Sequence, residues 1–435
     1  MSSIYARKAL LAGGWAEEVR FEISAGGIES IDRRASPADE EFRAGVVIPG
    51  ICNAHSHAFQ RALVGRAERR SPAAKDSFWT WREEMYRLAG ALDADMVRII
   101  ARQVYSEMLA AGYTSVVEFH YLHHAGIEAI ISAAEESGIR LTLVPILYER
   151  AGFNSPDPDD VQKLFIRSFD DFVALYEHAK TLENERVAIG IGSHSLRAVT
   201  KESIDRIAEI SKSDDVPLHI HLAEQQREVD ECLAHYKTRP ARWLLDRCDV
   251  DAGWCLVHAT HLEPDEITAI ARCGAVVCLC PSTEANLGDG VFALGAYLDA
   301  AGQIAIGSDS HVTIDPFEEL RWLEYGQRLE SRSRNVSAGH GVLFERAASG
   351  GRQACGQQTG RLEPGAVADL VVLDDSDPML HGHETDTLMD ALVFSGYPVP
   401  VERVMVQGEW RVIDGRHVDE GDARDDYRRI VEVLR

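Results

Sequence analysis

The sequence predicts an α/β protein: a (β/α)8 barrel with a small β-sandwich domain that both chain termini form. Eight short apolar, β-rich runs recur between residues 46 and 307, with amphipathic helical patterns between them. Parallel strands that are covered on both faces need such continuous apolar runs. The two ends of the chain show strand patterns without helices between them. A doubly wound open sheet is the alternative, but no Gly-rich phosphate-binding loop follows any run.

The change in pattern along the chain sets the predicted domains. Residues 50–358 are expected to form the barrel, and residues 1–49 and 359–435 the two parts of the small β domain. Strands of the small domain are expected over residues 17–23, 28–32, 368–373 and 401–407. The expected barrel strands span residues 46–52, 114–119, 140–147, 187–192, 217–222, 255–257, 275–280 and 303–307.

Three helices carry clear end signals. Asp93 can cap a helix over residues 96–111, because its side chain can accept from the free N–H groups of the first turn. Gly112 can end that helix in the left-handed conformation that glycine adopts easily. Helices are likewise expected over residues 201–211, after Thr200, and 317–329, after Asp315-Pro316.

The composition excludes several classes of partner. The formal net charge is −25, with 70 acidic and 45 basic residues, which argues against nucleic acid and against an anionic membrane surface. An anionic substrate would therefore need local arginine or lysine. No apolar run approaches the ~20 residues of a membrane span. Eight scattered cysteines predict buried reduced thiols, and the N-terminal residues lack a signal-peptide pattern, so we expect a cytoplasmic protein.

Polar residues at the ends of four predicted strands carry the chemistry. His55 and His57 close the first strand, and their i, i+2 spacing puts both imidazoles on one side of it. The fifth strand contains two further histidines, the sixth ends in His258 and the eighth is followed by Asp309. The carboxyl ends of barrel strands face one pocket. Several histidines with one carboxylate suit Zn²⁺, with Fe²⁺ and Mn²⁺ as alternatives, and such a site lowers the pKa of bound water to about 7.

These motifs resemble the amidohydrolase superfamily, in which H-x-H closes strand one, His closes strands five and six, and Asp closes strand eight. The resemblance covers nearly the whole chain and includes Pro49-Gly50 and the segment 365–370. Binuclear members carry a carboxylated lysine at the end of strand four. Residues 190–197 contain no lysine, so the resemblance favours one metal ion per chain. It implies four metal ligands: His55, His57, His221 and Asp309.

The resemblance also implies roles around the metal. His219 and His221 compete for the strand-five position, and His221 is preferred because the deaminases of this superfamily carry His-x-x-Glu there. His219 lies one layer deeper, where it could support the ligands. Glu224 is then the expected acid and base, Asp309 the acceptor of the water proton, and His258 the group that orients the nucleophile.

Three segments, residues 53–62, 78–86 and 118–124, are similar to one subgroup, the formimidoylglutamate deiminases of histidine breakdown. The resemblance implies a small dicarboxylate substrate, N-formimino-L-glutamate, and its hydrolysis to N-formyl-L-glutamate and ammonia. Arg82 and Arg197 would bind the two carboxylates. Trp79 and Trp81 are expected to pack rather than to react. The resemblance adds Gln60, Tyr121 and His194 as substrate contacts.

Three other readings remain. An aminohydrolase of a guanine, cytosine or adenosine type would need aromatic stacking and amide groups rather than two arginines. A triazine chlorohydrolase-like activity is a variant of that reading. The third reading is a non-catalytic scaffold. Such relatives typically lose metal ligands, whereas every expected ligand and Glu224 are present here. Members of the superfamily often form dimers, so the resemblance allows a homodimer, but no residue pattern in the sequence specifies one.

Overall fold

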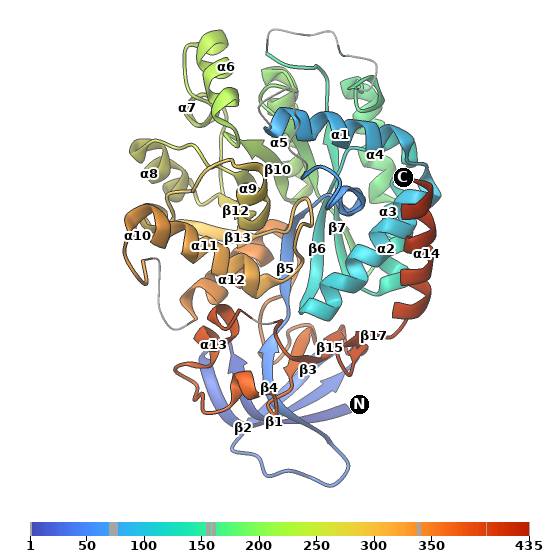
Figure 1. Cartoon of the computed structure of the whole chain (residues 1–435), viewed down its shortest axis with the longest axis vertical. Helices are drawn as coiled ribbons and strands as arrows, with labels where there is room; N and C mark the ends of the chain where they lie inside the picture. The colour runs from blue at the N-terminus through green and yellow to red at the C-terminus, as the bar shows by residue number, and fades with distance from the viewer. Residues whose placement is uncertain are drawn as a thin grey trace.

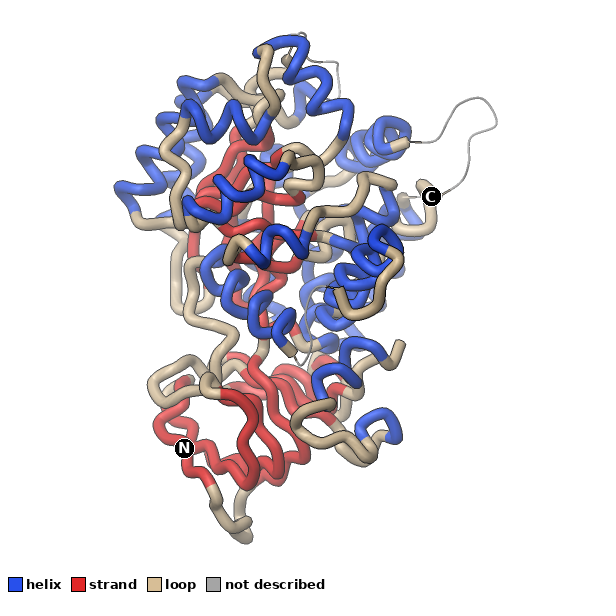
Figure 2. The backbone as a smooth tube through the Cα atoms, turned by 90° about the vertical axis from the view of Figure 1, so that its left-hand side faces the viewer, coloured by secondary structure: helices blue, strands red, loops and turns tan. Residues whose placement is uncertain are grey.

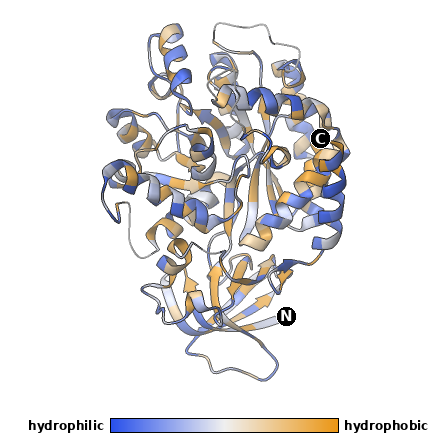
Figure 3. Ribbon diagram, viewed as in Figure 1, coloured by the Kyte–Doolittle hydropathy of each residue, from blue (hydrophilic) through white to orange (hydrophobic). Residues whose placement is uncertain are grey.

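The computed structural model describes residues 2–68, 77–153, 158, 162–336, 341–396 and 398–434. The chain forms a barrel of parallel strands wrapped by helices, and a separate sheet lies below its lower end (Figures 1 and 2). Apolar residues fill the barrel and the inner faces of its helices, and polar residues cover the outer helix faces (Figure 3). Among the described residues, no helix combines the length and apolarity needed to cross a bilayer.

The lower sheet is built from both ends of the chain, as predicted. Strand β4 pairs in parallel with β1 from the N-terminal segment and antiparallel with β14 from the C-terminal segment. The predicted sandwich takes the form of one curled eight-stranded sheet, in which Ile4, Phe21 and Val372 share a core. Its strands are β1 (Ser2–Leu11), β2 (Gly14–Ser24), β3 (Gly27–Arg33), β4 (Phe42–Pro49), β14 (Leu370–Leu373), β15 (Val401–Val406), β16 (Glu409–Ile413) and β17 (Arg416–His417).

The barrel contains eight strand positions in consecutive order, which confirms the predicted architecture. The fourth position is shared by two short strands, β8 and β9. The strands are β5 (Ile51–Ser56), β6 (Tyr113–His120), β7 (Arg140–Leu147), β8 (Val187–Ile189), β9 (Ile191–Ser195), β10 (Leu218–Leu222), β11 (Trp254–His258), β12 (Val276–Leu279) and β13 (Gln303–Ile306).

The predicted strand over residues 46–52 was wrong, because the chain leaves one sheet and enters the other inside it. Gly50 lies between β4 and β5, and a Cβ atom there would come within 2.2 Å of the Thr114 side chain. Gly190 separates β8 from β9 in the same way, since a Cβ there would lie 3.0 Å from the carbonyl oxygen of Pro217. Both runs are apolar without interruption, so the sequence does not reveal the breaks. The breaks occur where the backbone passes close to another segment of the folded chain.

Helices follow the strands around the barrel, and the three predicted ones form with the expected caps. Asp93 accepts from the Met96 N–H group, Thr200 from that of Ser203, and Asp315 from those of Phe317 and Glu318. The helices are α1 (Phe78–Ala91), α2 (Ala94–Ala111), α3 (Glu128–Ser137), α4 (Phe169–Lys180), α5 (Lys201–Asp214), α6 (Gln226–Tyr236), α7 (Pro240–Arg247), α8 (Pro264–Cys273), α9 (Pro281–Leu287), α10 (Leu294–Asp299), α11 (Pro316–Ser331), α12 (Val342–Cys355), α13 (Leu388–Phe394) and α14 (Glu420–Val433).

The last strand meets the first where the candidate site lies. The Asp309 N–H group donates to the carbonyl oxygen of His55, and the His57 N–H group donates to that of Asp309. Gly307 permits this approach, because a Cβ atom there would come within 2.8 Å of His55. The barrel closure thereby brings together polar groups that are about 250 residues apart in the sequence.

Candidate metal centre and substrate pocket

Four side chains from the first, fifth and last strand ends converge at the barrel mouth. His55 Nε2 lies 3.1 Å from His221 Nε2, and the Asp309 Oδ1 atom lies 3.6 Å from His55 Nε2 and 3.5 Å from His57 Nε2. A Zn²⁺ ion with bonds of about 2.0–2.1 Å in tetrahedral geometry would place its ligand atoms about 3.3 Å apart. These three separations suit a bound cation near His55, which belongs both to a group with His57 and Asp309 and to a group with His221 and His258. All four side chains are buried.

Hydrogen bonds on the far side of two rings orient the nitrogens that face the centre. His57 Nδ1 lies 3.0 Å from the carbonyl oxygen of Phe119, and His221 Nδ1 lies 2.9 Å from that of His194. A carbonyl can only accept, so each Nδ1 carries the proton and each Nε2 presents its lone pair to the centre. Burial also lowers the pKa of His57 to about 3, which keeps its imidazole neutral. Neutral imidazoles are the form that binds a metal ion.

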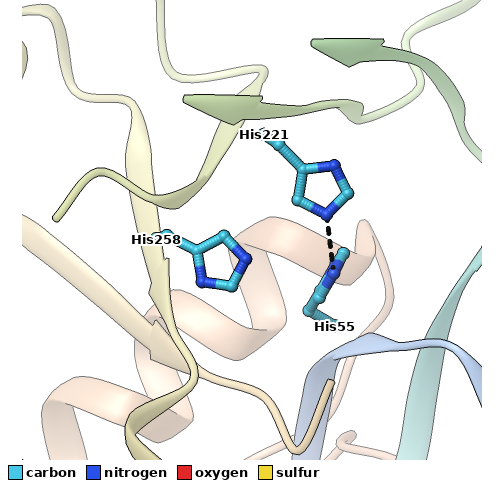
Figure 4. A group of neighbouring side chains, drawn as sticks. All are labelled: His55, His221 and His258. Carbon is cyan, nitrogen blue, oxygen red and sulfur yellow. Dashed lines mark hydrogen bonds between the residues drawn. The ribbon is translucent and has the colours of Figure 1, made fainter. Parts of the chain in front are cut away.

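His258 reaches the same centre from β11. Figure 4 shows His55 and His221 pointing at each other, with His258 beside them. Its Nε2 atom lies 3.8 Å from Asp309 Oδ2 and 4.0 Å from Glu224 Oε1, and its Nδ1 atom lies 3.2 Å from Glu284 Oε1. Burial disfavours the charged ring, but these three carboxylates prevail and raise the pKa of His258 to about 10. His258 is thus placed between the centre and Glu224.

Carboxylates around the centre favour a bound cation. The pKa of Asp309 is raised to about 7, mainly by burial; the nearby His258 lowers it, and Glu224 and Glu284 act with burial to raise it. A metal ion would supply the positive charge that these groups lack. Three described groups of potential ligand atoms lie close enough to hold an ion: His55 with His57 and Asp309, His55 with His221 and His258, and His258 with Cys280 and Asp309. The donor set therefore fits the metal that the sequence predicted.

The backbone at the strand ends is strained. His258 and Asp309 have φ angles of 68° and 48°, and Ala223, directly before Glu224, has a φ angle of 49°. A non-glycine residue pays about 1–3 kcal/mol in such a conformation, and these conformations concentrate at functional sites. Three such residues beside one centre indicate that the fold keeps these side chains in place at a cost in stability.

A pocket opens from this centre, and α1 forms its outer wall. From α1, the side chains of Phe78, Trp81, Met85 and Tyr86 line it. It brings together ten of the eleven predicted site residues: His57, Gln60, Arg82, Tyr121, His194, Arg197, His221, Glu224, His258 and Asp309. The eleventh, His55, lies fully buried behind His57 and His221.

Arg82 and Arg197 lie in this pocket without an acidic partner. Within the described chain, neither guanidinium forms an ion pair or donates a hydrogen bond, and the Nε atom of Arg197 is buried without a partner. Arg197 is only 6% exposed. A buried unpaired charge is costly, so a pocket that keeps one is suited to an anionic ligand. Arg82 therefore lines the pocket and does not pair with a described acidic residue on its own helix.

The other predicted contacts surround the same space. Gln60 Nε2 donates to the Tyr121 hydroxyl at 3.3 Å, and the Oε1 atom of Gln60 is buried without a partner. The rings of Tyr121 and His194 lie 5.7 Å apart, and Tyr121 also packs on His57 at 5.2 Å. Burial, with Arg197 next in effect, lowers the pKa of His194 well below its usual range. A neutral imidazole and an amide can both hydrogen-bond a small polar substrate.

One predicted supporting residue lies elsewhere, and two carboxylates were missed. His219 Nε2 lies 2.8 Å from the carbonyl oxygen of Ala354 in α12, deeper in the barrel, and makes no described hydrogen bond to the candidate ligands. Glu284 was missed, although it follows the seventh strand by five residues. Glu118 was missed too: it accepts from Ser56 Oγ at 2.5 Å and from the Ala58 N–H group at 2.8 Å. Its place at the end of β6 was the available signal.

Comparisons with known proteins identify the family of this chain. Residues 46–411 match the amidohydrolase family, and residues 1–43 match the N-terminal domain of formimidoylglutamate deiminase HutF. The chain is 48% identical to formimidoylglutamate deiminase from Pseudomonas aeruginosa, over 100% of this chain and 99% of that protein. It is 28% identical to 8-oxoguanine deaminase from the same organism, over 88% of this chain and 86% of that protein. A crystal structure of an amidohydrolase from Brucella melitensis superposes with a TM-score of 0.94 at 41% identity, over 100% of both chains.

Proposed function

The chain belongs to the amidohydrolase family and is a hydrolase of carbon–nitrogen bonds, and from this premise we propose that it deiminates N-formimino-L-glutamate in histidine degradation. The products are N-formyl-L-glutamate and ammonia. One observation carries the proposal: the pocket joins a histidine and carboxylate centre at one end to two arginines without acidic partners, Arg82 and Arg197. The formimino group and the two carboxylates of this substrate match those two ends.

The proposed chemistry distributes roles among the residues of the pocket. His55, His57, His221 and Asp309 would hold one metal ion, proposed as Zn²⁺, which would supply a water of lowered pKa as the nucleophile. Asp309 accepts the first proton of that water, and His258, held by Glu284, orients its oxygen. Glu224 carries the protons to the departing nitrogen. The oxygen of water joins the formimino carbon, the carbon–nitrogen double bond breaks, and ammonia leaves while the formyl amide remains.

Substrate binding is proposed to rest on charge-assisted hydrogen bonds. Arg82 and Arg197 each present a planar fork of donors that matches a carboxylate. Gln60, Tyr121 and His194 line the wall between the arginines and the metal ligands, where they can position the formimino group. The strongly acidic chain would otherwise repel a dianion. The positive charges of Arg82 and Arg197 offset this repulsion at the pocket, so that the substrate can enter.

The proposed metal content is one equivalent per chain. Elemental analysis of metal-replete protein should therefore give about one equivalent, because four ligands converge and no lysine ends the fourth strand. Replacing His221 with alanine removes one ligand and should lower that content strongly. Two tightly held equivalents in an active preparation would refute the mononuclear assignment, and full metal content in the His221→Ala variant would remove His221 from the ligand set.

The proposed activity is tested by ammonia release. Purified metal-loaded protein is incubated with N-formimino-L-glutamate, guanine, cytosine or adenosine, and the ammonia formed is measured. We expect turnover of N-formimino-L-glutamate only. Selective turnover of a nucleobase or nucleoside would overturn the substrate assignment and favour the aminohydrolase alternative, for which the two unpaired arginines offer no obvious use.

The proposed compartment is the cytoplasm. All eight cysteines are free thiols, and Cys52, Cys255 and Cys355 are among the six that are buried. Free thiols are the usual state of cysteine in a reducing compartment. A step of amino-acid breakdown would take place there.

A further inference from the structure

Three guanidinium groups surround one indole at the edge of the pocket. The Cζ atom of Arg227 lies 4.1 Å from the ring centroid of Trp79, that of Arg82 lies 4.4 Å from it, and that of Arg197 lies 5.6 Å from it. Trp79 and Arg82 belong to α1, and Arg227 belongs to α6, which begins two residues after Glu224. Arg82 and Arg197 line the pocket, whereas Arg227 is 58% exposed.

This arrangement collects positive charge against the trend of the chain. Three like charges around one ring repel one another, and the repulsion by Arg197 and Arg227 adds to burial in lowering the pKa of Arg82. The cation–π contacts with Trp79 offset part of that repulsion. The chain as a whole carries a net charge of −25, which repels a dianion. This cluster creates a local positive field that attracts a dianion toward the pocket.

Arg227 is held in this position from its own helix. Its Nε atom donates to Glu231 Oε1 at 2.7 Å, one helical turn along α6. That contact and the contact with Trp79 involve the same guanidinium group, so both favour the observed position of the side chain. Through Trp79, Arg227 also connects α6 to the helix that carries Arg82.

We propose that Arg227 is a specificity-determining residue that attracts the dicarboxylate substrate to the pocket and, through Trp79, positions Arg82 for it. The inference rests on the proposed function, since it assigns the outermost of three cations to the same substrate. Arg227 takes no part in the chemical step. It acts on substrate capture, so its loss should change KM and leave kcat nearly unaltered.

The test compares Arg227→Met with Arg424→Met, which removes the same charge from α14 on the outside of the barrel (Figure 1). Arg424 is 57% exposed and also has an acidic neighbour one turn away, so the two variants are matched. Arg227→Met should raise KM for N-formimino-L-glutamate about 3- to 10-fold, with kcat within about twofold. Its kcat/KM should also depend less on ionic strength, measured between about 20 and 500 mM salt. Arg424→Met should behave as the wild type.

Two further measurements separate a charge effect from a structural one. Arg227→Lys should restore the salt dependence but only part of the KM, because lysine keeps the charge and loses the planar contact with Trp79. Calorimetric binding of glutarate, a plain dicarboxylate, should weaken by the same factor in Arg227→Met. Glutarate binding tests the inference even if the wild type fails to release ammonia, an outcome that would overturn the proposed function alone. Equal KM values and equal glutarate affinities in the Arg227→Met and Arg424→Met variants would overturn the inference.

Discussion

Replacing Glu224 with glutamine is expected to lower kcat by at least about 10²-fold while the metal stays bound. General acid–base groups typically contribute about 10²- to 10⁴-fold, and glutamine keeps the shape of the side chain but cannot carry the proton. Glu224 Oε1 lies 4.0 Å from His258 Nε2 at the inner end of the pocket, and the strained backbone of Ala223 holds it there. The measurement is kcat for ammonia release, with metal content from elemental analysis of the same sample.

A neighbouring substitution controls for effects on α6 and on charge. Asp230→Asn changes an exposed carboxylate of α6, the helix that follows Glu224, in the same way, and it should retain wild-type activity. Thermal unfolding should show that both variants fold. Wild-type turnover by metal-loaded Glu224→Gln would remove Glu224 from the mechanism, and a loss of metal in that variant would reassign it as a ligand.

Replacing Arg197 or Arg82 with methionine is expected to lower kcat/KM for N-formimino-L-glutamate by about 10- to 150-fold. A charge-assisted hydrogen bond contributes about 1.5–3 kcal/mol, which converts to that range. Neither guanidinium forms an ion pair with a described residue, although burial raises the pKa of the Glu228 carboxyl and the charge of Arg197 lowers it.

A shorter substrate distinguishes binding from geometry. N-formiminoglycine retains the formimino group and one carboxylate but lacks the second. The arginine that binds the missing carboxylate should matter far less for this substrate, whereas the other should matter for both. Metal content should not change in either variant. Equal losses on both substrates in both variants would mean that the arginines support the fold or the catalytic geometry instead.

Local signals predicted the elements well because their causes are local. The cap at Asp93 and the helix end at Gly112 depend on side-chain and backbone preferences within one turn, and both form as expected. The apolar runs became barrel strands because each is buried on both faces. The histidines at strand ends could be predicted to meet, since parallel strands in a closed barrel end on one face. His219 could be placed one layer deeper by the same alternation, but its partner, the carbonyl oxygen of Ala354, could not.

The sequence by itself determined the barrel, the sheet shared by both termini and the set of polar residues at the strand ends, because periodicity and strand position encode them. Only the tertiary structure decided which neighbours those residues have. It split the run 46–52 at Gly50, placed Glu284 against His258, and gathered Arg82 and Arg197 around Trp79 with no ion pair to a described acidic residue. These features arise from contacts between segments far apart in the chain, and no local preference specifies such contacts.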